Sequence, residues 1–283
     1  MIAVTLMWSI AGVVSRHLEA ARSFEVTFWR SLFNGVALVG LLGAWRGPAT
    51  LARAVRDGDR ALWLSGLCWA VMFTAFMLAI TLTTVANVLV TMAIAPLLTA
   101  LVARVALGHR LAARTWAAIV VAGIGIAWMY AREVSGSDPR HLLGTAVALA
   151  VPVAAAANWV LIQHNRGARQ RDMLPAVLIG ALLSALATLP LALPFAASAR
   201  DLALLALLGT VQLAIPCLLA VTAARSLSAP EISLLALLEV VFGVAWAWLG
   251  ANEAPSVHVL GGGLLVLAAL AGNEVLALVR PKA

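Results

Sequence analysis

The sequence is dominated by long apolar runs that are separated by short polar connections. Ten runs follow one another, at residues 2–17, 24–45, 61–80, 84–106, 113–130, 141–163, 173–195, 201–223, 230–250 and 256–278. A bilayer core of about 30 Å requires roughly 20 mostly apolar residues in helical form. The runs do not alternate between apolar and polar residues, as strands of an outer-membrane barrel do. The pattern therefore predicts an all-α integral membrane protein with ten transmembrane helices.

The basic residues in the connections predict how these helices are oriented, because Lys and Arg concentrate in cytoplasmic loops. With a cytoplasmic amino terminus, the inner connections and tail hold 13 basic residues: Arg46, Arg53, Arg56, Arg60, Arg104, Arg110, Arg114, Arg166, Arg169, Arg171, Arg225, Arg280 and Lys282. The outer connections hold five: Arg16, Arg22, Arg132, Arg140 and Arg200. This asymmetry predicts ten spans with both termini cytoplasmic.

Composition supports a chain whose main solvent is lipid. Of its 283 residues, 63% are hydrophobic and 11% are charged, against roughly 45–50% and 25% in soluble domains. The net charge of +7 does not indicate a nucleic-acid partner, because the basic residues never form a tract with interleaved aromatic residues. We expect the partners to be the lipid bilayer and a small-molecule substrate, and the protein to be a monomer or a weak dimer.

Cysteine, histidine and the start of the chain add little further chemistry. Cys68 and Cys217 lie far apart within apolar runs, and we interpret both as free thiols buried in lipid. The first run has no basic leader and no small-residue cleavage site, so we expect no cleaved signal peptide. No histidine has a second ligand three or four residues away, which predicts no metal site and no cofactor; the five are His17, His109, His141, His164 and His258.

An internal repeat is indicated by the ten runs and by a weak sequence match. The polar stretch 132–140 divides the runs into two groups of five, which predicts repeats at residues 1–135 and 136–283. Residues 95–109 align without gaps with residues 239–253, and each segment precedes a glycine-containing final run. Because five is odd, the second repeat must enter the membrane in the opposite direction. Such inverted repeats are typical of secondary transporters that work by alternating access.

Several short motifs lie within this framework: Arg30 early in the second run, Pro96-Leu-Leu and Leu107-Gly-His-Arg-Leu111 around the end of the fourth, and Leu237-Leu-Glu239 with Asn252-Glu253 around the ninth. With these motifs the chain resembles the drug/metabolite transporter superfamily, and in particular its EamA-like ten-helix exporters. The resemblance covers essentially the whole chain. The chain departs from the family at His109, where Glu is usual, and at Val240, where Pro is usual.

The resemblance implies export of small metabolites, commonly amino acids including aromatic ones, across a bacterial inner membrane. It implies neither catalysis nor ATP hydrolysis, and the chain contains no Gly-x-x-x-x-Gly-Lys-Ser/Thr phosphate loop. Drug-like or quaternary cations are an alternative substrate class within the same superfamily.

Two charged residues are the sharpest candidates for substrate binding. Glu239 lies nine residues after Glu231, about 13 Å along a helix, and a carboxylate at that depth costs roughly 2.5–3.5 kcal/mol. It either contacts a substrate ammonium or carries a proton, or it is a protonated or capped carboxyl with no role in transport. Arg30 lies six residues into the second run, where it either snorkels to the headgroups or binds a substrate carboxylate.

Amide and aromatic side chains supply the remaining candidates. Asn34, Asn87, Asn158 and Gln212 must find partners in hydrocarbon, either between helices or in a cavity. Trp69, Phe73 and Met77 share one face of the third run and are either packing residues or one wall of a pathway. Trp159 and Trp246 are further candidates for lining the pathway, because they lie away from the expected headgroup belts.

Two other functional classes fit the sequence less well. A membrane-embedded enzyme needs grouped nucleophiles, bases or metal ligands at membrane depth, and Glu239 has no such neighbour in the sequence. A passive channel needs rings of carbonyls or charges, and we find no repeated filter sequence. The sequence therefore favours a transporter that is not an enzyme.

Overall fold

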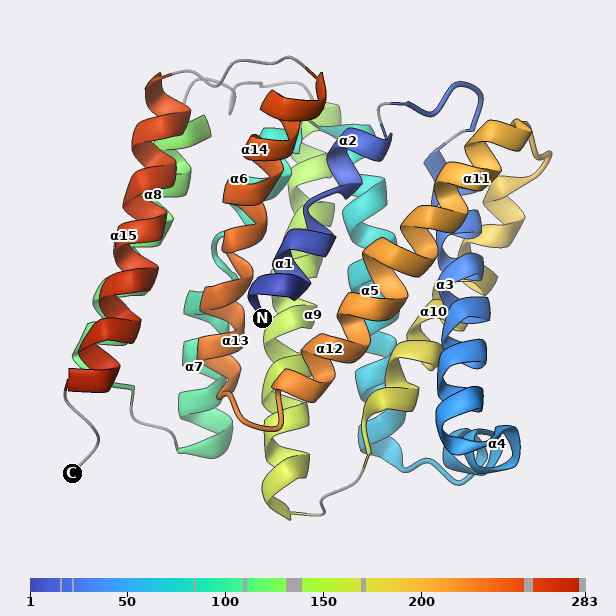
Figure 1. The fold of residues 1–283 in the computed structure, drawn as a ribbon, viewed down its shortest axis with the longest axis horizontal. Helices are drawn as coiled ribbons and strands as arrows, with labels where there is room; N and C mark the ends of the chain where they lie inside the picture. The colour runs from blue at the N-terminus through green and yellow to red at the C-terminus, as the bar shows by residue number, and fades with distance from the viewer. Residues whose placement is uncertain are drawn as a thin grey trace.

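The computed structural model describes residues 1–15, 17–21, 23–83, 85–108, 111–130, 139–168, 172–251 and 257–279. Helix is the only regular secondary structure within these ranges (Figure 1). The predicted all-α class is therefore confirmed for the described part of the chain.

The helices follow the predicted apolar runs closely, except that the helix Pro48–Arg56 lies in the connection between the second and third runs. The first half of the chain contains α1 (Ile2–Trp8), α2 (Ala11–Ser15), α3 (Ser23–Arg46), α4 (Pro48–Arg56), α5 (Arg60–Leu82), α6 (Val85–Met92), α7 (Ala95–Leu107) and α8 (Ala113–Tyr130). The second half contains α9 (Pro139–Ala168), α10 (Leu174–Ala192), α11 (Ala199–Leu207), the π-helix η1 (Leu208–Ala214), α12 (Ile215–Ala223), α13 (Ala229–Ala236), α14 (Leu238–Ala251) and α15 (Val257–Val279).

Length and hydropathy indicate a multi-pass membrane protein. Within the described ranges, five helical stretches are long and apolar enough to cross a membrane: Phe24–Arg46, Arg60–Leu82, Leu142–Asn165, Leu174–Ala192 and Ala199–Ala223. Shorter apolar helical stretches are Ile2–Ser15, Ala95–Leu107, Ala113–Trp128 and Leu260–Asn273. The count of ten spans and the side on which the termini lie stay predictions.

Several of the predicted runs are interrupted rather than continuous. The first run breaks between α1 and α2, the fourth between α6 and α7, and the ninth at Leu237 between α13 and α14. Pro96 explains the second of these breaks, because a proline cannot bond to the carbonyl four residues earlier, here that of Met92 at the end of α6. Pro216 has the same effect on Gln212, and the chain there forms the wider turns of η1.

Helix packing repeats when each run is matched with the run five places later. α5 packs against α9 and α10, and the matched elements η1 and α12 pack against α3 and α1. Likewise α7 packs against α9, and α14 packs against α1. Three matched pairs pack directly against each other: α3 with α10, α7 with α13, and α8 with α15 (Figure 1). The fold thus consists of two groups of helices with equivalent neighbours.

Glycines allow the closest of these helix contacts. A Cβ added at Gly180 of α10 would lie 2.3 Å from the Cβ of Trp69 on α5. A Cβ added at Gly125 of α8 would lie 2.7 Å from the carbonyl oxygen of Gly262 on α15. Small residues give such close backbone approach in membrane bundles, where packing rather than water drives association.

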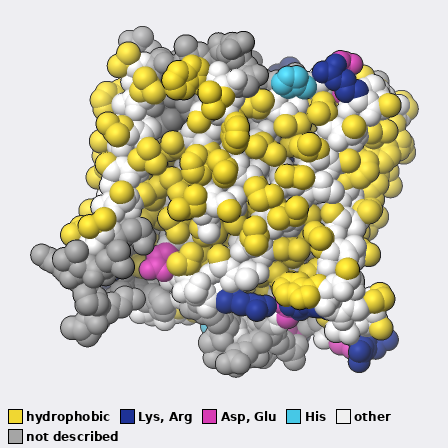
Figure 2. Space-filling view, in the orientation of Figure 1, with side chains coloured by type: hydrophobic (Ala, Val, Ile, Leu, Met, Phe, Trp, Pro, Cys, Tyr) yellow, Lys and Arg dark blue, Asp and Glu magenta, His cyan; other side chains and the backbone are white. Residues whose placement is uncertain are grey.

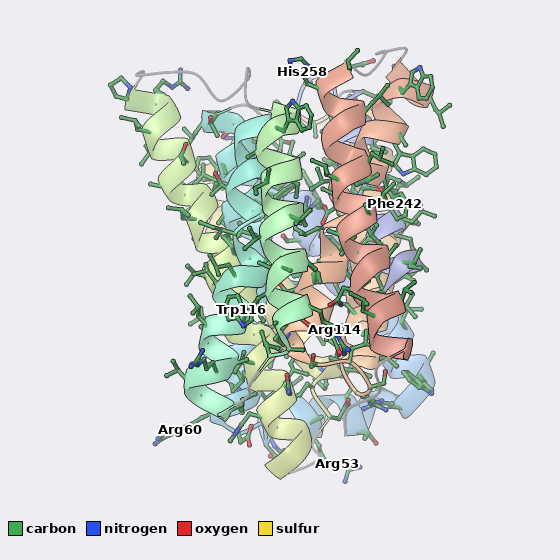
Figure 3. All side chains as sticks on the ribbon, turned by 90° about the vertical axis from the view of Figure 1, so that its left-hand side faces the viewer. Arg53, Arg60, Arg114, Trp116, Phe242 and His258 are labelled. Atoms are coloured by element: carbon green, nitrogen blue, oxygen red, sulfur yellow. The ribbon has the colours of Figure 1, made fainter. Side chains whose placement is uncertain are left out.

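The outer surface of the bundle is broadly apolar, while the charged residues visible on it lie near its two ends (Figure 2). Many large apolar side chains are exposed, among them Leu186 on α10 and Leu249 on α14. Arg53, Arg60 and Arg114 lie toward one end of the molecule and His258 lies at the other (Figure 3). An exposed apolar surface of this extent requires lipid around it.

Candidate functional site

A cavity of about 130 Å³ lies among the helices of both halves of the chain. Its wall is formed by residues of α1, α3, α5, α6, α7, α9, η1, α12, α13 and α14. Most of the wall is apolar or aromatic, with Trp8, Trp69, Phe73, Phe76 and Trp159 as its rings. Arg30, Gln212 and Glu239 add charged and polar groups.

The interruptions in the helices lie at this cavity. Trp8 is the last residue of α1, and Leu237 lies between α13 and α14. Met92 and Ala95 flank the break between α6 and α7. Broken helices expose backbone groups inside a membrane protein, and such groups are tolerated where they line a cavity.

Arg30 is buried in the cavity wall with little to compensate its charge. Its side chain is 2% exposed, and Nη1 donates to Sδ of Met77 on α5 over 2.9 Å. A thioether sulfur is a weak acceptor, and Nε of Arg30 has no partner. Snorkelling to the headgroups, one of our two interpretations of Arg30, is therefore wrong, because the guanidinium points into the bundle.

Glu239 lies on another side of the same cavity, in the first turn of α14. It is half-buried, and among the described residues its carboxylate has no hydrogen bond; the charge of Arg30 attracts it without a direct ion pair. The break at Leu237 begins a new helix just before Glu239, and the positive end of a helix dipole stabilises a carboxylate. The break thus helps a carboxylate to lie at this depth without a direct ion pair.

Gln212 lines the cavity, and its side chain bonds to the end of α1 at the break in the first run. Its side chain is 4% exposed, and Nε2 donates to the backbone carbonyl of Trp8 over 3.2 Å. The other end of the amide, Oε1, is buried and has no partner.

The aromatic wall is built on α5 and α9. The rings of Trp69 and Phe73 have centroids 5.5 Å apart, and the rings of Trp69 and Trp159 form an edge-to-face pair at 5.6 Å. Nε1 of Trp69 is buried without a partner. Met77 continues the same helix face but does not line the cavity, since its sulfur instead accepts from Arg30.

The remaining predicted residues lie outside the cavity wall. Asn158 accepts a hydrogen bond from Oγ of Ser65 over 2.6 Å, which links α9 to α5. Trp246 donates to Oγ of Ser9 over 3.0 Å and so holds α14 against the break between α1 and α2. Asn34 is fully buried in α3 with both amide atoms unpartnered. Asn87 belongs to α6, but its side chain lies outside the described part of the structure.

Comparison with known proteins decides the family. The model of the EamA-like transporter family matches the chain twice, over residues 1–131 and 142–273. The chain belongs to the EamA-like transporter family. A solved crystal structure shares the fold, with a TM-score of 0.79 over 99% of this chain and 96% of its own, at 18% sequence identity. No curated protein matches the sequence.

Membership of the EamA-like family makes this chain a membrane transporter of small molecules, because the members of that family are transporters rather than enzymes. The two matched segments also support a chain built from two repeats. Within the described ranges, no group of three His, Cys, Asp or Glu side chains could hold a metal ion.

Sequence reasoning missed several residues of the cavity wall of this EamA-like protein. Trp8, Met92 and Phe76 line it, although nothing in their runs distinguishes them from residues that face lipid. Cys217 also lines it and is 1% exposed, so its interpretation as a thiol buried in lipid is wrong. Pro216 was the available signal, because the irregular helix before it turns this part of the run toward the cavity.

Proposed function

We propose that this transporter exports small metabolites, foremost amino acids with aromatic or other apolar side chains, across the bacterial inner membrane. One observation carries the proposal: a single aromatic cavity contains Arg30 and Glu239, which are not paired with each other. A zwitterionic amino acid carries an anion, a cation and an apolar body. Arg30 binds its carboxylate, Glu239 binds its ammonium, and Trp69, Phe73 and Trp159 contact its side chain.

Transport proceeds by alternating access between two inverted five-span halves, residues 1–135 and 136–283, with both termini in the cytoplasm. The matched helix packing supports this mechanism, as does a cavity formed by both halves. The fourth run of each half is broken beside the cavity, which is where inverted-repeat transporters bind their substrates. The arginines of Figure 3 that lie toward one end are the cytoplasmic ones in this proposal.

Predicted residues outside the cavity wall have positioning roles in this proposal. Met77 holds the guanidinium of Arg30, Asn158 fixes α9 beside Trp159, and Trp246 braces the break after α1. Asn34 lies one helical turn after Arg30 on α3 and belongs to the same polar region. Asn87 has a role in this proposal only because a polar amide within an apolar run requires a partner.

Drug-like or quaternary cations are a second candidate substrate class. The observation in their favour is the combination of three tryptophans, Trp8, Trp69 and Trp159, with the carboxylate of Glu239. Aromatic faces and a nearby carboxylate attract organic cations. Arg30 argues against this class, because a buried guanidinium repels a cation that has no carboxylate.

Counterflow in proteoliposomes tests the proposal. Liposomes are loaded with unlabelled phenylalanine, methionine or threonine, and the entry of the labelled amino acid is followed for the wild type, Glu239→Gln and Arg30→Ala. Saturable counterflow that is lost in either variant supports amino-acid transport through the cavity. Flat traces for every amino acid from folded protein contradict it, and counterflow of tetraphenylphosphonium instead would support the cation alternative.

A further inference from the structure

Gln212 presents a hydrogen-bond acceptor whose orientation is fixed by chemistry. The backbone carbonyl of Trp8 can only accept a hydrogen bond, so the amide group that faces it must be the NH2 of Gln212. Oε1 therefore lies at the other end of the amide. The hydrogen bond to α1 holds the side chain in place, and Pro216 removes the partner of the Gln212 backbone carbonyl, which shapes the turn that carries it.

This acceptor is buried, lacks a partner, and belongs to a residue of the cavity wall. Gln212 is 4% exposed, and no donor reaches its Oε1. A buried amide oxygen without a donor is unfavourable, so a bound molecule that supplies an N–H or O–H gains affinity here. A solute without such a donor leaves the oxygen unpaired.

We propose that Gln212 makes this cavity select cations that carry N–H groups, and above all primary ammonium, over quaternary ammonium. The inference deepens the proposed function and rests on it. A primary ammonium has three N–H donors, so it keeps a donor for Oε1 of Gln212 as well as its charge attraction to the carboxylate of Glu239. A quaternary ammonium keeps the charge attraction to Glu239 but has no donor for Gln212. A site that hydrogen-bonds its substrate rejects analogues that lack the donor.

Two matched pairs of solutes test this selectivity in proteoliposomes of the full chain. The first pair is L-phenylalanine and its N,N,N-trimethyl derivative, and the second is phenethylamine and its N,N,N-trimethyl derivative. In the wild type, the primary amine of any transported pair should have a KM about tenfold or more below that of its trimethylated partner. The second pair extends the test to a transporter whose substrates are cations rather than amino acids.

Variants within η1 then test whether Gln212 causes this selectivity. Gln212→Leu should raise the KM of the primary amine about tenfold and leave that of the trimethylated compound unchanged. Thr210→Val is the matched control, because Thr210 lies in the same π-helix and its hydroxyl bonds only to backbone carbonyls of its own helical stretch. The control should keep the wild-type ratio of the two KM values.

Three outcomes separate failure of this inference from failure of the proposed function. Equal KM values for both members of a transported pair in the wild type overturn the selectivity of Gln212 and leave amino-acid transport standing. An equal change of both KM values in Gln212→Leu assigns the residue a merely structural role and overturns the inference as well. Absence of counterflow for all four solutes, and for methionine and threonine as well, contradicts the proposed function, and the inference falls with it.

Discussion

Carboxylates in two regions of this bundle have opposite surroundings. At the end of the bundle away from α4, Glu25 accepts from the backbone N–H groups of Ala196 and Ala197 at 2.8–3.0 Å. There too, Asp201 accepts from Glu19, Ala20 and Ala21 at 2.8–3.1 Å. In the cavity, Glu239 has no such partner among the described residues.

The difference separates two uses of an acid in a membrane protein. Glu25 and Asp201 connect the loop after α2 and the loop after α10 to the helices that carry them, and we name this set of hydrogen bonds the clasp. Each carboxylate of the clasp is fully buried and fully satisfied, which is the pattern of a structural group. A carboxylate that lines a cavity without hydrogen bonds is instead available to bind a solute that enters the cavity.

The largest expected effect is the loss of a clasp carboxylate. Asp201→Ala removes the acceptor of three backbone N–H groups, those of Glu19, Ala20 and Ala21, and a hydrogen bond to a charged group contributes about 1.5–3 kcal/mol. We expect the free energy of unfolding in detergent to fall by about 3 kcal/mol or more. Thermal unfolding followed by size-exclusion chromatography measures this, and Asp57→Ala, whose partner Arg56 is exposed, is the control.

The second effect should appear in transport and not in stability. Glu239→Gln removes a charge that has no hydrogen bond or direct ion pair among the described residues, so the melting temperature should stay the same or rise. Transport should fall by about tenfold or more, the equivalent of one strong contact. Glu231→Gln is the matched control, because Glu231 bonds to the backbone N–H of Ser228 in a capping box. If Glu239→Gln unfolds the protein and transport per folded molecule is unchanged, the comparison with the clasp fails.

A smaller effect is expected for the link between α5 and α9. Ser65→Ala deprives Oδ1 of Asn158 of its donor, and a buried hydrogen bond of this kind contributes about 1 kcal/mol. The melting temperature should fall modestly, and the KM of the transported solute should rise less than in Glu239→Gln, because neither residue lines the cavity and only the position of Trp159 is affected. Thr81→Val, at an exposed position of the same helix, is the control.

The smallest effect is expected at the other end of α3. Asp172 pairs there with Arg46 and, at 3.6 Å, with Arg225, whose side chain is 58% exposed. Arg225→Ala should reduce stability by less than about 0.5 kcal/mol, because exposed ion pairs are screened by water and salt. Unfolding at low and high ionic strength measures this contribution, and a loss as large as that of Asp201→Ala would contradict the ranking.

Much of the fold follows from the sequence because lipid leaves few choices for an apolar run. The ten runs mark where the helices lie, and Pro96 and Pro216 mark two of the irregular positions. The breaks at Ser9 and Leu237 contain no proline or glycine, so no local signal in the sequence reveals them. They depend on tertiary contacts such as the hydrogen bond from Trp246 to Ser9.

The candidate site was only partly readable for the same reason. Arg30, Glu239, Gln212 and Trp159 stand out, because polar or bulky groups in hydrocarbon require an explanation. Their partners do not stand out in the sequence. Arg30 bonds to Met77, and Gln212 bonds to the carbonyl of Trp8, only because the folded chain makes their helices neighbours. Periodicity predicts which residues share a helix face, but it does not predict which helix packs against that face.

The contact between Gly125 and Gly262 affects the order in which the helices can pack during synthesis on the ribosome. α8 is complete at residue 130, but α15, which packs along it, ends at residue 279. At about 5–20 residues per second, the ribosome needs roughly 7 to 30 s to make the intervening chain. During that interval Gly125 of α8 lacks its partner helix. The first half of the molecule must therefore stay in the membrane with this helix face unpacked until α15 is inserted.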